Sequence, residues 1–169
     1  LRQNLGVVPQ ETFLFSATVR ENVLLGAPDD GRLERVAEVS QLAEALPDLP
    51  NGYDTLLGER GINLSGGQKQ RAAIARALAQ DPPVFILDDA LSAVDAHTEA
   101  RILAGLRDAL AGRTSVIISH RLAAVRDADW IIVLDGGRVV EQGVHADLLA
   151  AGAKKVIISA PATEPDVTI

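Results

Sequence analysis

The sequence predicts an α/β fold in which helices cover a mostly parallel β-sheet. Short apolar runs of strand length alternate with segments of helical periodicity, which is typical of such folds. The chain has 169 residues, of which 47% are hydrophobic and 23% are charged. It is therefore long enough and apolar enough to bury a core, and its length suits one domain of ordinary size.

Each expected strand is a short run of apolar residues, several of them β-branched. The expected strands are residues 5–8, 84–87, 115–119, 131–134 and 138–141. The run at 84–87 is continuously apolar, so we expect it to be buried on both faces, and we expect the run at 115–119 to be buried as well. Asp135-Gly136-Gly137 separates the last two runs and predicts a hairpin turn.

The expected helices show helical spacing of apolar residues or are rich in strong helix formers. They are residues 33–46, 68–80, 98–110 and 146–150. Pro47 and Pro50 end the first helix, Asp81-Pro82-Pro83 ends the second and Gly112 ends the third. A loop rich in Gly, Asn and Asp is expected between the first two helices.

Composition excludes several classes of protein. The 16 Lys and Arg against 23 Asp and Glu give a net charge of −7, which argues against bulk nucleic-acid binding. The chain has no cysteine, which excludes a disulfide scaffold and thiolate chemistry and fits a reducing compartment. No apolar run approaches the roughly 20 residues of a membrane helix. Because the chain begins at Leu1 and contains no methionine, we interpret it as a piece of a longer sequence.

The sharpest motif is Leu64-Ser65-Gly66-Gly67-Gln68, which directly precedes the Ala- and Arg-rich helix. A serine at a helix start caps the first turn, and two glycines let the backbone approach a ligand closely. Free backbone N–H groups and the positive end of the helix dipole then favour a phosphate. The alternative interpretation is a plain serine cap after a glycine turn.

Two further groups of polar residues follow expected strands. Asp88 and Asp89 come directly after the run at 84–87, where open α/β sheets place their ligands. One carboxylate suits Mg²⁺ bound through water, and the next suits a base that orients or deprotonates an attacking water. His120 follows the run at 115–119 and is suited to donate a hydrogen bond to a phosphate. The alternatives are a solvated Asp pair and a structural histidine; we interpret His97 and His145 as structural.

Taken together, these motifs closely resemble the nucleotide-binding domain of ATP-binding cassette (ABC) transporters of exporter type. The resemblance covers about residues 1–152 and rests on the order and spacing of several motifs. In the family's terms, Val8-Pro9-Gln10 is similar to the Q-loop, Leu64 to Gln68 to the signature motif, Ile86 to Asp88 to Walker B, Ser92 to Asp95 to the D-loop, and His120 to the switch histidine. Tyr53 to Thr55 and Gly58 to Gly61 resemble the exporter loop that touches the coupling helices.

The resemblance implies a P-loop ATPase fold with a RecA-like parallel sheet, helices on both faces and a helical subdomain at about residues 15–80. It implies ATP and Mg²⁺ as ligands, a second nucleotide-binding domain and a transmembrane domain as partners, and a place at the cytoplasmic face of the membrane. The residues it assigns to phosphate binding across the dimer are Ser65, Gly66, Gly67 and Gln68, with Asp95 bridging the two sites. It assigns Gln10 and Asp88 to the metal, Asp89 to the general base and His120 to the γ-phosphate.

The chain departs from the family pattern in two ways that affect chemistry. No Gly-x-x-x-x-Gly-Lys-Ser/Thr string occurs in the 169 residues, so the Walker A strand and loop are missing. Asp89 stands where most hydrolysing members have glutamate, which resembles the degenerate half of a heterodimeric exporter. A homodimer in which Asp89 acts as a slow base is the alternative.

The last residues, 153–169, do not resemble the end of an exporter domain. Gly152 to Pro161 is similar to a strand of glyceraldehyde-3-phosphate dehydrogenase, and a fusion, an artefact, a chimera and coincidence all stay open. Without the Walker A strand, two strand edges would face each other unpaired between the His120 strand and the Trp130 strand. We expect Lys154 to Ser159 to form a strand that fills this gap.

Two other functional classes stay open. A non-catalytic module that only binds a partner domain is consistent with the missing loop. A chromosome-maintenance or DNA-repair ATPase shares the signature and Walker B logic, but such proteins carry long coiled-coil heptads, and none occur here.

Overall fold

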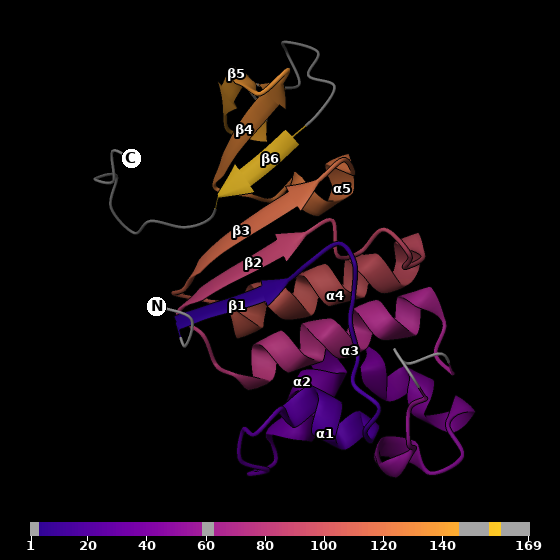
Figure 1. Cartoon of the computed structure of the whole chain (residues 1–169). Helices are drawn as coiled ribbons and strands as arrows, with labels where there is room; N and C mark the ends of the chain where they lie inside the picture. Colours follow the sequence, from indigo (N-terminus) through magenta and orange to yellow (C-terminus); the bar gives the residue numbers. More distant parts are fainter. Residues whose placement is uncertain (1–3, 59–62, 146–155, 160–169) are drawn as a thin grey trace.

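A six-stranded sheet forms the centre of the computed structural model, which describes residues 4–58, 63–145 and 156–159 (Figure 1). The strand order is β1-β2-β3-β6-β4-β5. The first three strands are parallel, and β4 and β5 form an antiparallel hairpin. The strands are β1 (Leu5–Val8), β2 (Val84–Asp88), β3 (Thr114–Ser119), β4 (Trp130–Asp135), β5 (Arg138–Gly143) and β6 (Val156–Ser159). All five strands expected between residues 5 and 141 are therefore present.

Strand β6 lies between β3 and β4 and is antiparallel to both. Ile157 is opposite Ile118 of β3 on one side and opposite Ile132 of β4 on the other. The prediction that this segment fills the gap in the sheet is confirmed. Because β6 pairs on both sides, it joins the β4–β5 hairpin to the parallel strands (Figure 1).

One face of the sheet, toward which Phe85 and Leu87 point, is covered by helices. These are α3 (Gly66–Ala79), α4 (Ala96–Ala109) and α5 (Leu122–Val125). Both side chains that point toward these helices are buried, whereas Val84, Ile86 and Asp88 on the opposite face of β2 are half-buried. The prediction that this strand is fully buried on both faces is therefore wrong, and β3 is half-buried along most of its length. The resemblance also implies helices on the opposite face of the sheet, and this part stays a prediction.

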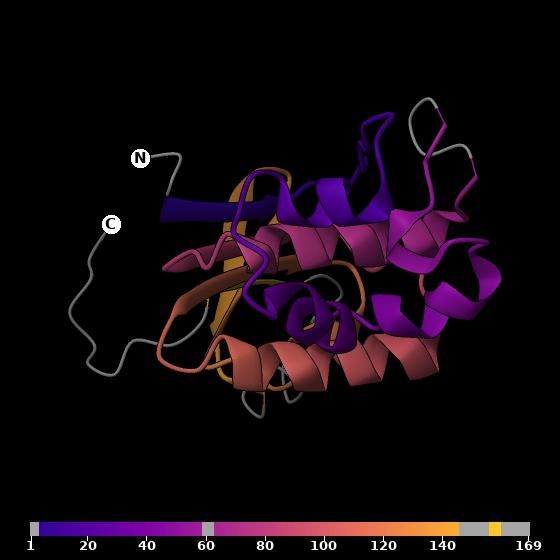
Figure 2. The same ribbon diagram turned by 90° about the horizontal axis from the view of Figure 1, so that it is seen from below.

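The helical elements before α3 form a separate group beside it (Figures 1 and 2). A single helix over residues 33–46 was expected, but the structure has two. The first ends at Val39, and Gln41 then adopts a left-handed φ of 59°, which redirects the chain before a 3₁₀ helix that contains Pro47. The helices are α1 (Val19–Leu24), α2 (Arg32–Val39), η2 (Leu42–Asp48), η3 (Gly52–Asp54), α3 (Gly66–Ala79), α4 (Ala96–Ala109) and α5 (Leu122–Val125). The expected helix at 146–150 lies outside the described residues.

Helix α3 lies between two hydrophobic cores, and Figure 2 shows it next to α1. Ala72 and Ala75 pack into the core of the helical elements, while Ile74 and Ala77 pack into the core beneath the sheet. Small side chains let neighbouring elements approach a helix closely on two sides. The alanine-rich composition of this helix therefore reflects burial on both faces as well as helix propensity. No helix in the described part of the chain is long and apolar enough to cross a membrane.

Candidate functional site

The start of helix α3 is fixed by a reciprocal cap. The Ser65 hydroxyl accepts a hydrogen bond from the backbone N–H of Gln68 at 3.2 Å, and the Gln68 side-chain oxygen accepts one from the backbone N–H of Ser65 at 2.8 Å. This capping box confirms the predicted serine cap. The helix begins two residues earlier than predicted, so Gly66 and Gly67 lie in its first turn.

The two glycines leave the beginning of α3 open to solvent. Ser65 and Gly66 are exposed, and the backbone N–H groups of Gly66 and Gly67 donate to no acceptor among the described residues. A Cβ at Gly67 would lie 3.0 Å from the carbonyl oxygen of Ala93, so this position requires glycine for close approach of two backbones. Free N–H groups at a helix start form an anion site.

A hollow of about 350 Å³ lies in front of this helix start. It is lined by the three residues Ser65 to Gly67, by Arg71 and by residues of the loop that follows β2. Among the latter is Asp95, which caps helix α4 by accepting hydrogen bonds from the backbone N–H groups of His97 at 3.1 Å and Thr98 at 3.0 Å. The bond from Thr98 is the main reason that the pKa of Asp95 lies below its ordinary value. The predicted residues Ser65, Gly66, Gly67 and Asp95 therefore share one hollow.

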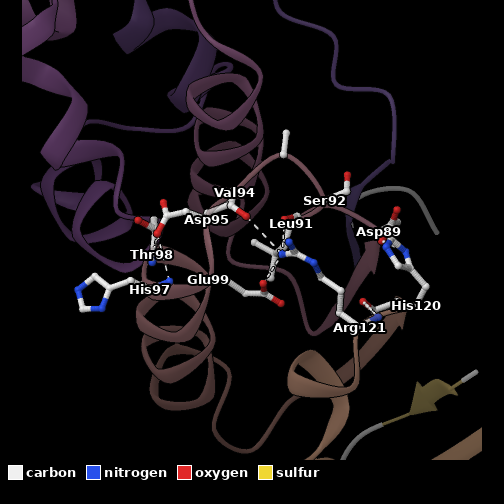
Figure 3. Close-up of polar contacts among 12 residues, drawn as sticks. Asp89, Leu91, Ser92, Val94, Asp95, His97, Thr98, Glu99, His120 and Arg121 are labelled. Carbon is white, nitrogen blue, oxygen red and sulfur yellow. Dashed lines mark hydrogen bonds and ion pairs between the residues drawn. The ribbon is translucent and has the colours of Figure 1, made fainter.

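Asp89 and His120 form the second polar group, shown in Figure 3. The His120 Nδ1 atom lies 3.0 Å from the Asp89 Oδ1 atom. They meet because β2 and β3 are adjacent and parallel, and the backbone N–H of Asp89 also donates to the Ile118 carbonyl at 2.8 Å. Asp89 has a left-handed φ of 45°, a conformation that aspartate tolerates better than most residues. The side chain of Asp89 is 15% exposed and that of His120 is 61% exposed, so the pair opens to solvent on the histidine side.

The two residues expected to hold the metal follow neighbouring strands. Asp88 is the half-buried last residue of β2, and Gln10 is exposed two residues after β1. Val8 is opposite Leu87, so both residues lie at the same edge of the sheet. No cluster of three or more His, Cys, Asp or Glu side chains able to hold a metal occurs in the described part. One carboxylate and one amide oxygen are oxygen donors of the kind that Mg²⁺ accepts beside water and phosphate.

The structure thus gathers the predicted residues into two groups, and no hydrogen bond or ion pair between described residues joins them directly. His97 is exposed at the start of α4. Sequence reasoning did not single out Gln70 and Arg121, which contact the loop between the two groups. The available signals were a glutamine among the alanines of α3 and an arginine directly after His120.

Comparisons with known proteins agree with this geometry. The family model of ABC transporters matches residues 1–92. The chain is 50% identical over 155 residues to an uncharacterized ABC transporter ATP-binding protein, YknU, of Bacillus subtilis, covering 90% of this chain and 26% of that protein. It is 49% identical over 154 residues to the human mitochondrial iron-sulfur clusters transporter ABCB7, covering 89% of this chain and 20% of that protein.

A solved structure of a bacterial Atm1-family ABC exporter with ATP bound is similar with a TM-score of 0.85 and 44% identity, over 90% of this chain and 27% of that one. The fold is thus that of an ABC exporter nucleotide-binding domain, of the P-loop NTPase class. The chain belongs to the ABC transporter family. It spans about a quarter of the length of the relatives it matches.

Proposed function

We propose that this chain is part of the nucleotide-binding domain of an exporter whose complete protein hydrolyses ATP to move a substrate across a membrane. The observation that carries the proposal is the open start of α3, where two glycine N–H groups are free to bind an anion. The similarity to exporter ATP-binding proteins supports the same function. ATP would be the substrate, held between two domains that associate head to tail.

The start of α3 would bind the γ-phosphate of a nucleotide held by the opposing domain. The N–H groups of Gly66 and Gly67 and the hydroxyl of Ser65 would donate to its oxygens, helped by the dipole of α3. Gln68 would keep the loop in shape through the cap already described. Asp95, which faces the same hollow, would contact the partner domain and connect the two sites.

The Asp89–His120 pair would serve the nucleotide of its own domain. Asp89 would accept a proton from the attacking water, and its 3.0 Å contact with His120 would hold the carboxylate in position. His120 would direct its other ring nitrogen to the γ-phosphate. Gln10 and Asp88 would hold Mg²⁺, which when bound supplies neutralisation of phosphate charge.

The partners of the domain follow from the same proposal. A second nucleotide-binding domain would complete each site, and a transmembrane domain would place the assembly at the cytoplasmic face of a membrane. We assign residues 1–152 to part of the nucleotide-binding domain, with a helical subdomain at about 15–80, and residues 153–169 to an atypical tail. Nucleic acid is no partner in this proposal.

Lengthening the carboxylate at position 89 tests whether this domain is the degenerate half of a heterodimer. Asp89→Glu is expected to raise the rate of hydrolysis at this domain's own nucleotide by about 10²-fold, because one methylene brings the carboxylate about 1 Å closer to the attacking water. The left-handed φ of 45° costs the longer residue up to about 1–2 kcal/mol of stability, so thermal unfolding is measured with the steady-state rate.

The matched control is Asp88→Glu, which makes the same change at the neighbouring carboxylate and is expected to lower the rate. An unchanged or lower rate for Asp89→Glu, together with loss of activity in Asp89→Asn, would show that Asp89 itself is the working base of a homodimer.

We also propose that this chain by itself binds ATP weakly and does not hydrolyse it. Its 169 residues contain no Gly-x-x-x-x-Gly-Lys-Ser/Thr string, whose backbone and lysine hold the phosphates in P-loop proteins. Titration calorimetry of the chain with Mg-ATP is expected to give a Kd of about 1 mM or weaker, which corresponds to about −4 kcal/mol of binding free energy. Submicromolar affinity would contradict this expectation.

A further inference from the structure

The loop between the two polar groups is held by side chains from two other elements. This loop, residues 91–95, connects β2 to α4 and is called here the 91–95 turn. On one side, Gln70 of α3 donates from Nε2 to the Ser92 hydroxyl at 3.0 Å and accepts from the backbone N–H of Ala93 at 2.9 Å. Gln70 itself is 5% exposed, whereas its partners Ser92 and Ala93 are exposed.

On the other side, Arg121 contacts the same turn (Figure 3). Its Nη1 atom donates to the carbonyl oxygens of Leu91 at 3.2 Å and Val94 at 3.3 Å, and it is paired with the Glu99 carboxylate. The Glu99 side chain is 5% exposed. A buried carboxylate without this guanidinium would be strongly unfavourable, so the pair fixes the position of Arg121.

Each of these two side chains is close in sequence to one of the polar groups. Gln70 lies four residues after Gly66 on the same helix, and Arg121 directly follows His120. Movement of the start of α3 therefore displaces Gln70, and movement of the 91–95 turn displaces Arg121. The turn is the shared partner of both side chains.

We propose that Gln70 and Arg121 are positioning residues that connect the start of α3 to the Asp89–His120 pair through the 91–95 turn. What the two groups bind rests on the proposed function, but the connection is a property of the fold. In the complete protein, a phosphate bound at Gly66 and Gly67 would thereby fix the orientation of His120 in the same domain. Such coupling is a free energy shared by two sites and works in both directions.

The connection is measured by NMR on the full chain without nucleotide. Gln70→Leu keeps the side-chain size but removes both hydrogen bonds, and it is expected to speed amide exchange at Ala93 by about tenfold. It is also expected to shift the ¹⁵N signal of His120 Nδ1, the atom that lies 3.0 Å from the Asp89 carboxylate. In the reverse direction, Arg121→Gln is expected to shift the amide signals of Gly66 and Gly67.

Two substitutions of the same kind act as controls. Gln80→Leu removes a 2.8 Å bond from the other end of α3 to the Leu24 carbonyl. Arg113→Gln removes an arginine that binds the Pro82 carbonyl and the Asp81 carboxylate. Neither residue contacts the 91–95 turn in the described structure, so neither is expected to move the signals of the distant group.

A double variant separates coupling from two local effects. Each single variant changes the exchange rate at Ala93 by some factor, and independent effects would multiply in Gln70→Leu/Arg121→Gln. If both residues act through one turn, the rate in the double variant will be at least about threefold lower than this product. Should Arg121→Gln fail to fold, Glu99→Gln removes the charge pairing with similar volume and is expected to shift the same glycine signals.

The proposal would be overturned if the effects of the two single variants on the Ala93 exchange rate simply multiply in the double variant. It would also be overturned if Gln70→Leu speeds exchange at Ala93 but leaves the His120 signal unchanged. Neither outcome bears on the proposed function, because the measurement involves no nucleotide. Conversely, a complete protein without ATPase activity would contradict the proposed function and leave the connection between the two groups standing.

Discussion

Gly66→Asp is expected to lower ATP hydrolysis by the complete protein by about 10²-fold or more. The N–H groups at this position would stabilise phosphate charge, and removal of a single comparable donor costs active sites about 10²–10³-fold in rate. The substitution goes further, because it places a negative charge where the γ-phosphate is expected. The rate is measured as steady-state phosphate release, and nucleotide-dependent association of the domains is followed in parallel.

The folding of α3 is not expected to suffer from this change. Aspartate in the first turn of a helix interacts favourably with the helix dipole, by about 0.3–1 kcal/mol. A Cβ at Gly66 would lie 3.3 Å from the Ala93 side chain, a contact that requires only a small adjustment. The matched control is Gly66→Asn, which has nearly the same shape without the charge. Equal loss in both variants would assign the effect to shape, and retained activity in Gly66→Asp would show that no phosphate binds there.

Ile157→Pro is expected to lower the free energy of unfolding by about 3 kcal/mol or more. Proline has no backbone N–H and is excluded from the middle of a sheet. Ile157 is paired with strands on both sides. Disrupted pairing at this residue therefore affects the attachment of the β4–β5 hairpin as well as β6 itself. Denaturation in urea, followed by circular dichroism, gives the change.

The control at this position is Ile157→Val, which keeps the backbone N–H and a β-branched side chain, and its effect is expected to stay near 1 kcal/mol. Hydrogen exchange adds a local test, because amides of β3 and β4 that pair with β6 should exchange faster in the proline variant. Equal stability of the proline variant and the parent chain would contradict the central position of β6.

Much of the fold was predictable because its signals are local. Apolar runs located the strands, and Ser65 ahead of the Ala- and Arg-rich segment indicated the start of α3 to within two residues. The position of β6 was predictable from a wider argument, since strand edges that face each other inside a sheet need a partner. The break between α2 and η2 was missed because nothing in the Leu33–Leu46 spacing shows that Gln41 adopts a left-handed conformation.

Motifs indicated the candidate site residues one by one but not the contacts among them. Motifs identified Asp89 and His120, while their 3.0 Å contact follows from the pairing of β2 with β3. The contacts of Gln70 and Arg121 depend on three elements that are distant in sequence. Interactions of this kind are products of packing, so no periodicity or motif shows them in advance.

The direction of β6 determines which end of this strand lies at the edge of the sheet that holds Asp89 and His120. In parallel sheets, ligands gather beyond the carboxyl ends of the strands. Val156, at the amino end of β6, is opposite Ser119, whereas Ser159 is opposite Val116. The inserted strand therefore runs backward through the sheet and directs its carboxyl end away from Asp89 and His120. It restores the backbone pairing of β3 and β4 but brings its amino end, not its carboxyl end, to the edge of the sheet where Asp89 and His120 lie.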